Sequence, residues 1–352
     1  MDPMVLTLPL WDIAMLDFSP LLNLPLIAGG VIAAAIFLYV LLDGFDLGVG
    51  LLFPFAPSEE CRNKMMNSIA PFWDGNETWL VLGGGGLFAT FPLAYAILLP
   101  AFYIPIILML LGLIFRGVAF EFRFKSKGKM HTLWDYSFHF GSLTATFFQG
   151  VLLGAFVVGV SVKGRTFGGG PFDWLTAFSL MTGAALTFGY ALLGATWTIL
   201  KTNGKTQEWA RKAALYSLLY VALFMGLVSL WVPFLNDRIF IRWFTFPNLA
   251  YLSPIPLLTA ITFISLYHSL LKKQELKPFI LAILLFTLGY LGLMVSLWPW
   301  IVPYEISLWQ AAANPKSLSL ILLGVFFLLP VTLGYTVYSY YVFRGKSSHH
   351  YE

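Results

Sequence analysis

Long apolar runs separated by short polar joints are the feature that most restricts the fold of this 352-residue sequence. A helix needs about 20 largely apolar residues to cross the hydrocarbon core of a membrane. Nine stretches meet this requirement, near residues 26–52, 77–99, 101–121, 137–162, 174–200, 213–235, 249–271, 279–302 and 317–343. Charged residues make up only 11% of the chain, whereas soluble domains carry about 25%. We therefore expect an all-α integral membrane protein with nine transmembrane helices.

No linker, low-complexity tract or soluble module interrupts these runs. We expect one polytopic membrane domain over residues 1–352, with a segment at the outer surface (1–25), the nine spans (26–343) and a cytoplasmic tail (344–352). The first segment contains no Lys or Arg, so it lacks the basic start of a cleavable signal peptide. The second and third spans meet at Leu99-Pro100, which predicts an antiparallel hairpin there.

The distribution of cations predicts the orientation in the membrane. One set of loops holds fifteen cationic residues, namely Arg62, Lys64, Arg123, Lys125, Lys127, Lys129, Lys201, Lys205, Arg211, Lys212, Lys272, Lys273, Lys277, Arg344 and Lys346. The other set holds five, namely Lys163, Arg165, Arg238, Arg242 and Lys316. Because cytoplasmic loops are enriched in Lys and Arg, the first set is predicted to face the cytoplasm. The N-terminus is then outside and the C-terminus inside, as an odd number of spans requires.

Several kinds of site are disfavoured by composition. Cys61 is the only cysteine, which excludes disulfides and cysteine-rich metal sites. The net charge of +4 is explained by the loops that orient the spans, and it gives no indication of nucleic-acid binding. His139 and His268 lie near the cytoplasmic ends of their spans, and a structural role is favoured for both. Because no two histidines face each other at mid-membrane, we do not expect a bis-histidine haem held by this chain alone.

Two carboxylates stand near the cytoplasmic end of the first span, in the stretch LYVLLDGFDLGVG (38–50). Each Asp would cost about 2.5–3.5 kcal/mol at mid-membrane and less near the interface. Asp43 and Asp46 are three residues apart, so they share one face of a helix, and both oppose the dipole at its C-terminus. Either a cation neutralises them or at least one is protonated. Alternatively, both side chains reach the headgroup region, although the apolar residues that follow argue against this.

Further charged residues fall at a similar predicted depth on the next two spans. Arg116 lies in the cytoplasmic half of the third span, where it either pairs with a carboxylate or extends to the headgroups. Asp74, Asn76 and Glu77 begin the second span, and they could be only an N-cap and an acidic first turn. The alternative is a cluster in which coupled carboxylates share and pass a proton that enters from the cytoplasm.

Glycines are concentrated at three places. Residues 83–86 are four consecutive glycines, and the spacing of Gly85 and Ala89 predicts close helix packing. Spans one and five carry loosely similar glycine-rich stretches, LLDGFDLGVG and LTFGYALLGATW, which hint at an internal duplication.

Three segments together carry a family resemblance. LLDGFDLGVGLL, SIAPFWDGNETWLVLGGGGLFATFPLAYA and YIPIILMLLGLIFRGVAFEFR follow one another at close spacing. They resemble subunit II of the cytochrome bd-type quinol oxidases most strongly over residues 38–125. The D-G-F-D-x-G-V-G and W-D-G-N motifs are specific, whereas the later spans match mainly in hydropathy.

The resemblance implies a fold and a division of labour. It implies nine spans arranged as two four-helix bundles plus one peripheral helix, related to the partner by a pseudo-twofold axis. It also implies a partner, the haem-bearing subunit I, which binds two haems b, a haem d or third haem b, and the quinol. A small accessory subunit, quinone and lipids are further partners that this family implies. The complex would lie in a prokaryotic cytoplasmic (inner) membrane.

The same resemblance assigns roles to individual residues. The chain would contain no catalytic residue or axial haem ligand of its own. Its proton pathway would use Asp43, Asp46, Asp74 and Arg116, together with Glu77, at which the family varies. Trp73 and Asp74 would form a haem-facing interface.

A proton-coupled secondary transporter is the alternative function, because buried carboxylates with an arginine also suit that class. Against it, the charges gather near one membrane face, and no broken helices in matching repeats are evident. A haem spectrum in the purified native complex would distinguish the two.

Overall fold

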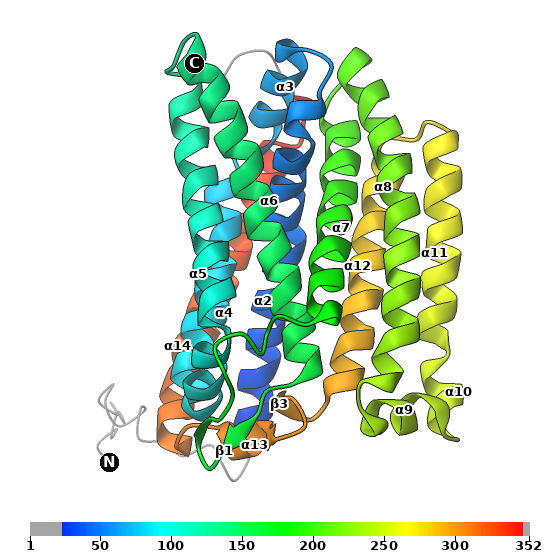
Figure 1. The fold of residues 1–352 in the computed structure, drawn as a ribbon. Coiled ribbons are helices and arrows are strands. Elements are labelled where there is room, and N and C mark those ends of the chain that lie inside the picture. The colour runs from blue at the N-terminus through cyan, green and yellow to red at the C-terminus, as the bar shows by residue number, and fades with distance from the viewer. Residues whose placement is uncertain (1–22, 348–352) are drawn as a thin grey trace, which may run out of the picture.

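The computed structural model describes residues 23–347, most of which form long, roughly parallel and antiparallel helices (Figure 1). The predicted outer-surface segment therefore lies almost wholly outside the described residues, as does the end of the predicted tail. The long helices are α2 (Leu24–Leu52), α4 (Trp73–Thr90), α5 (Pro92–Arg123), α6 (Lys129–Val158), α7 (Ala177–Lys201), α8 (Gly204–Trp231), α11 (Pro254–Leu271), α12 (Leu276–Leu297) and α14 (Pro315–Val342).

Short elements cover the two ends of the helical bundle (Figure 1). At one end lie η1 (Phe53–Phe55) and α3 (Glu59–Ile69). At the other lie two antiparallel hairpins and several short helices: β1 (Val162–Lys163), β2 (Thr166–Phe167), η2 (Val232–Phe234), α9 (Asp237–Phe244), α10 (Asn248–Leu252), β3 (Trp300–Val302), β4 (Ile306–Ser307) and α13 (Leu308–Ala311). The two sets of cations that the sequence separated thus belong to opposite ends of the bundle.

Local capping explains where several long helices begin. The side chain of Asn23 accepts a hydrogen bond from the Leu26 amide at 3.3 Å at the start of α2. Thr176 and Ser179 form a reciprocal capping box at the start of α7. Such contacts satisfy backbone amide groups that have no partner within the helix. An amide group left without a hydrogen bond in or near a membrane is energetically costly.

The connection between the second and third predicted spans differs from the prediction. The chain does not turn at Leu99-Pro100, because these residues lie inside α5; instead α4 ends before Phe91, which alone separates it from α5. A bend follows at Phe102, whose φ of −118° and ψ of 16° are not helical. Pro105 explains it: proline has no amide hydrogen, and its ring clashes with the carbonyl of the residue four positions earlier. The prolines therefore bend a continuing helix rather than end one.

Eight helical segments among residues 23–347 are long and apolar enough to cross a membrane. α4 is not among them, since its 18 residues include a polar first turn and four glycines. An all-helical membrane protein is therefore confirmed, while the count of nine stays a prediction.

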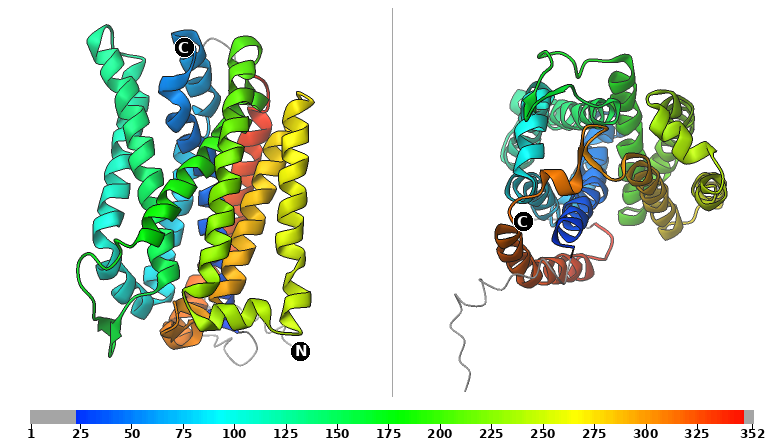
Figure 2. Two further views of the ribbon diagram at one scale, coloured as in Figure 1. Left: turned by 45° about the vertical axis from the view of Figure 1, so that its right-hand side comes forward. Right: turned by 90° about the horizontal axis from the view of Figure 1, so that it is seen from below.

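α2 lies in the interior of the bundle, in contact with α4, α6 and α7 (Figure 2). Its closest approach to α7 is at Gly48 and Gly194: a Cβ atom placed on Gly48 would lie 2.7 Å from the Gly194 amide nitrogen and would overlap the Tyr190 carbonyl. Only glycine allows backbones to come this close. The two stretches that looked alike in sequence therefore pack against each other.

The four consecutive glycines of α4 pack differently from the prediction. A Cβ atom on Gly83 or Gly86 would contact Ile36 or Ile32 of α2, at 3.2 and 3.4 Å, whereas one on Gly85 would meet nothing within 4 Å. Close packing of the glycine run is therefore found, but through Gly83 and Gly86; the predicted Gly85 face is turned away from α2.

Candidate functional site

Arg116 and Asp43 form a fully buried ion pair between α5 and α2. Nη2 of Arg116 donates to Oδ1 of Asp43 at 2.6 Å, and the exposed fractions of the two side chains are 0% and 1%. The alternatives in which these side chains reach the headgroups are therefore wrong for both residues. A buried charge without a partner is far more costly than a paired one, so each residue requires the other.

Glu77 of α4 brings a second carboxylate to the same guanidinium. Its Oε1 lies 2.5 Å from Nη2 of Arg116, and its side chain is 28% exposed. Trp73, one turn earlier on α4, places its ring centroid 5.5 Å from Cζ of Arg116 in a cation–π contact. Arg116 thus links α2, α4 and α5, and Glu77 is the member of this group that opens toward the surface.

Asp46 is held by an amide rather than by the arginine. Nδ2 of Asn76 donates to Oδ2 of Asp46 at 2.7 Å and to the Leu42 carbonyl at 3.2 Å. Oδ1 of Asn76 accepts from the hydroxyl of Tyr340, on α14, at 3.0 Å. Asn76 is therefore not a helix cap: Phe72 occupies the N-cap position of α4 and makes no side-chain capping bond.

The charges in this cluster do not balance. Three carboxylates, on Asp43, Asp46 and Glu77, face one guanidinium, and buried polar atoms remain without a protein partner: Oδ2 of Asp43, Oδ1 of Asp46, and Nε and Nη1 of Arg116. In a low-dielectric surrounding, three anions near one cation favour the sharing of a proton. Such a cluster can accept, hold and release a proton.

Asp74 stands apart from this cluster. It lies in the first turn of α4 with an exposed side chain, and no hydrogen bond or ion pair is formed by it within residues 23–347. Its position suits an acidic residue near a helix N-terminus. Three of the five charged residues predicted to meet, Asp43, Glu77 and Arg116, are thus in contact. Asp46 is bound by Asn76 instead, and Asp74 is outside the contact group.

A second row of hydrogen-bonded polar residues, which has no signature in the sequence, adjoins Asp43. Nε2 of Gln149, on α6, donates to the Tyr39 hydroxyl at 2.6 Å, and the Tyr190 hydroxyl, on α7, donates to Oε1 of Gln149 at 2.9 Å. Tyr39 lies one turn before Asp43 on α2, so both share one face. No spacing rule could connect these residues, because they come from three helices distant in sequence.

The described histidines are engaged with the protein itself. Nδ1 of His139 lies 3.2 Å from the Gly50 carbonyl, and Nδ1 of His268 lies 2.8 Å from the Ile264 carbonyl. Nδ1 of His131 lies 3.1 Å from the Arg123 carbonyl, and its Nε2 lies 3.3 Å from Glu59. His131 and His139 both lie on α6, and His268 lies in the last turn of α11.

Fold and site together define a polytopic helical membrane protein with a buried carboxylate–arginine cluster toward one end. Residues 24–343 match the family model for cytochrome bd terminal oxidase subunit II. The chain belongs to that family. It is accordingly a subunit of a membrane-bound oxidoreductase and a multi-pass protein of the bacterial cytoplasmic membrane.

Individual relatives agree with this assignment. The chain is 33% identical to cytochrome bd ubiquinol oxidase subunit 2 of Bacillus subtilis (strain 168), over 91% of this chain and 96% of the relative. It is 27% identical to cytochrome bd-I ubiquinol oxidase subunit 2 of Escherichia coli (strain K12), over 88% and 91%. The fold is similar to a chain in the structure of bd oxidase from Geobacillus thermodenitrificans, with a TM-score of 0.69, 16% identity, and coverage of 91% of this chain and 97% of that one.

Proposed function

We propose that this chain lines the route by which a quinol-oxidising terminal oxidase takes up protons from the cytoplasm. In the complex, quinol is oxidised and O₂ is reduced to water, which consumes protons. The observation that carries the proposal is the Arg116 site, where buried Asp43 and partly exposed Glu77 meet one guanidinium, 2.6 and 2.5 Å from Nη2.

The route begins at Asp74 and Glu77. Asp74 is exposed at the start of α4 and attracts protons from the cytoplasmic side, and Glu77 passes them inward because it is exposed on one side and contacts Arg116 on the other. Asp43 and Asp46 hold the proton within the bilayer, while Arg116 keeps the carboxylates together and offsets their charge.

The redox groups belong to the partner in this proposal. Haem-bearing subunit I ligates the irons of two haems b and of a haem d or third haem b, and it binds the quinol. The match of residues 24–343 to the subunit II family supports this division. Trp73 and Asp74, at the exposed start of α4, form the face directed at the haems. A small accessory subunit, bound quinone and lipids complete the assembly.

The membrane arrangement follows from the same proposal. α4 completes the count of nine spans. It can be short and polar because the partner subunit, rather than lipid, covers it. Residues 26–343 form a single membrane domain of two four-helix bundles plus the peripheral helix α14. The end that bears α3 faces the cytoplasm, and residues 344–352 are its tail.

The test is oxygen consumption with quinol by the purified complex. Asp43→Asn should lower turnover by roughly tenfold or more, as expected for loss of a proton-transfer group, while the haem content and visible redox spectrum are retained. Asp74→Asn should slow turnover less, since the residue is exposed. Asp237→Asn, on α9 at the opposite end of the bundle, is the matched control and should have no effect.

Unchanged turnover in Asp43→Asn would reject the proposed route. A colourless preparation without a partner that moves a solute would instead favour the proton-coupled secondary transporter.

A further inference from the structure

The geometry points to Tyr340 of α14 as a positioning residue for Asp46, held in place by a clamp that joins the end of α14 to α7 and to the α11–α12 loop. We define the clamp as Lys201, Glu275 and residues 343–347. This inference rests on the proposed function, because it assigns a means of control to the same carboxylate site.

The hydrogen bonds from Tyr340 to Asp46 have only one possible direction. The Leu42 carbonyl can only accept, so the amide nitrogen of Asn76 must face it and Asp46. Oδ1 of Asn76 must then face Tyr340, whose hydroxyl has to donate to it. Tyr340 therefore fixes the orientation of Asn76, and Asn76 presents its N–H to Oδ2 of Asp46. Each donor in this chain favours the ionised carboxylate.

The ring of Tyr340 is packed independently of its hydroxyl. It stacks on Phe72, with ring centroids 4.4 Å apart and planes 14° from parallel, and meets Phe45 edge-on at 6.4 Å. Phenylalanine can occupy this place without a cavity. The hydroxyl can therefore be removed while the packing is kept.

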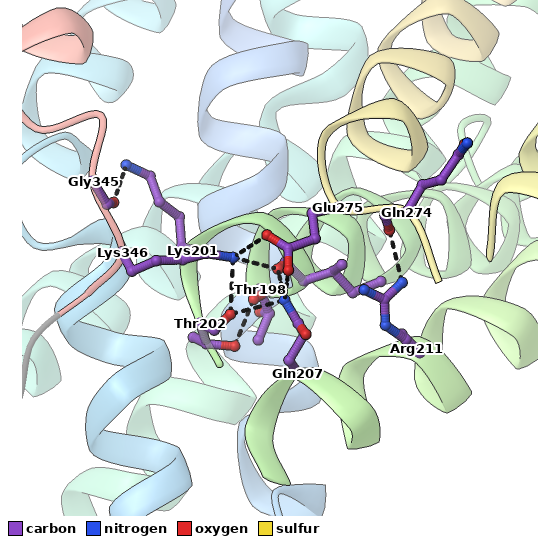
Figure 3. A network of polar contacts seen from close by, with 10 residues as sticks. Thr198, Lys201, Thr202, Gln207, Arg211, Gln274, Glu275, Gly345 and Lys346 are labelled. Carbon is purple, nitrogen blue, oxygen red and sulfur yellow. Dashed lines mark hydrogen bonds and ion pairs between the residues drawn. The ribbon is translucent and has the colours of Figure 1, made fainter. Parts of the chain in front are cut away.

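Two lysines cap each other's helices in the clamp (Figure 3). Nζ of Lys201, the last residue of α7, donates to the carbonyls of Phe343 and Gly345, just beyond α14. Nζ of Lys346 donates to the Thr202 carbonyl at 3.1 Å, just beyond α7, and pairs with Glu275 at 2.7 Å. The Ser347 amide also donates to the Lys201 carbonyl at 2.7 Å. Lysines near helix C-termini satisfy free carbonyls and oppose the helix dipole.

The clamp matters because α14 is otherwise weakly held. Only Leu318 and Ser319 of its 28 residues are buried, and many of its large apolar side chains are exposed in this chain. The clamp begins three residues after Tyr340, less than one helical turn away. Fixing the end of α14 therefore fixes the height and rotation of the Tyr340 hydroxyl relative to Asn76.

The charged and hydrogen-bonding groups that face Asp46 come from four helices. They are Asp43 on α2, Asn76 and Glu77 on α4, Arg116 on α5 and Tyr340 on α14. Of these, only Asn76 contacts Asp46 by a hydrogen bond within the described residues, so the Tyr340–Asn76 contact controls the one protein donor that Asp46 has.

The experiment is the pH–rate profile of quinol-dependent oxygen consumption by the purified complex. Tyr340→Phe should move the profile toward higher pH by about one unit, as expected for weakening a hydrogen bond to a charged group. Haem content should not change. Tyr338→Phe, on the exposed face of α14, is the matched control. A profile for Tyr340→Phe that coincides with the control would overturn the inference.

A second arm tests the clamp. Lys346→Met should move the profile in the same direction by a smaller amount, and Tyr340→Phe with Lys346→Met should equal Tyr340→Phe alone, because both act through one hydroxyl. Additive shifts would reject the clamp's role. Asp46→Asn separates the two proposals: if it leaves turnover and profile unchanged, the proposed route at Asp46 fails; if it alters them while Tyr340→Phe does not, only the present inference fails.

Discussion

Nη2 of Arg116 lies 2.6 Å from Oδ1 of Asp43, although the two residues are 73 positions apart in the sequence. Neither side chain is exposed, so bulk solvent cannot replace a lost partner. Removing one partner of a buried pair generally costs about 3–5 kcal/mol. Arg116→Gln should therefore lower the thermal unfolding midpoint of the purified complex clearly.

The double variant provides the control for that prediction. Arg116→Gln with Asp43→Asn should recover part of the lost stability, since neither charge is then left alone. Arg62→Gln, whose side chain is 25% exposed, should change the midpoint little. Equal effects of Arg116→Gln and Arg62→Gln would show that the buried pair is not a major contributor to stability.

Helix packing at Gly48 is predicted to tolerate no side chain. Gly48→Ala would place a methyl group into the backbone of α7, at the Tyr190 carbonyl and the Gly194 amide, which cannot move as a flexible side chain can. Gly84→Ala is the control, because a Cβ there meets nothing within 4 Å, and alanine favours a helix by about 1 kcal/mol over glycine. The thermal unfolding midpoint should therefore be lowered by Gly48→Ala and unchanged or raised by Gly84→Ala. The reverse order would contradict the close α2–α7 approach.

The clamp at the end of α14 should weaken in acid. Hydrogen bonds from Lys346 and Gln207 hold the pKa of the Glu275 carboxyl below its ordinary value. A carboxyl with a depressed pKa in the folded state stabilises that state above its unfolded pKa, about 4.3, and the contribution is lost as the pH falls through the folded value. Hydrogen exchange at the Ser347 amide, corrected for intrinsic rates, should therefore accelerate below about pH 4.3 in the wild-type chain.

In Glu275→Gln, hydrogen exchange at the Ser347 amide should be fast even at neutral pH, because the negative charge that attracts Lys346 is absent. Glu208→Gln, at an exposed position on α8, should behave like the wild type. An exchange rate at Ser347 that is the same in Glu275→Gln and Glu208→Gln would mean that the ion pair does not hold the tail.

Much of the buried cluster could be predicted because charge in a membrane helix is rare. Asp43, Asp46 and Arg116 are conspicuous in apolar runs, and topology alone placed them at similar depth. Asn76 and Tyr340 could not be joined in this way: they are 264 residues apart, and a tyrosine near a span end usually belongs to the aromatic belt. Tertiary contact, rather than any local pattern, gives Tyr340 its position.

The prediction of the boundary between α4 and α5 was wrong for a different physical reason. Proline in a sequence indicates a break, yet inside a membrane helix it often produces only a bend, since neighbouring groups can satisfy the freed carbonyl. Pro100 and Pro105 are both inside α5, and the real break at Phe91 precedes Pro92, where proline is well suited to a first turn. The predicted span 77–99 joined the apolar end of α4 to the start of α5, whereas α4 by itself is too polar and glycine-rich to qualify as a span.

The cluster joins residues that leave the ribosome at very different times. Asp43 and Asp46 are synthesised well before Arg116, and Tyr340 follows Asn76 only after 264 further residues. α2 must therefore enter the bilayer carrying two acids before their cation has been synthesised, which favours their neutral, protonated forms during insertion. Asn76 receives its hydroxyl donor only when the last helix is in place, so assembly of this region is complete only at the end of translation.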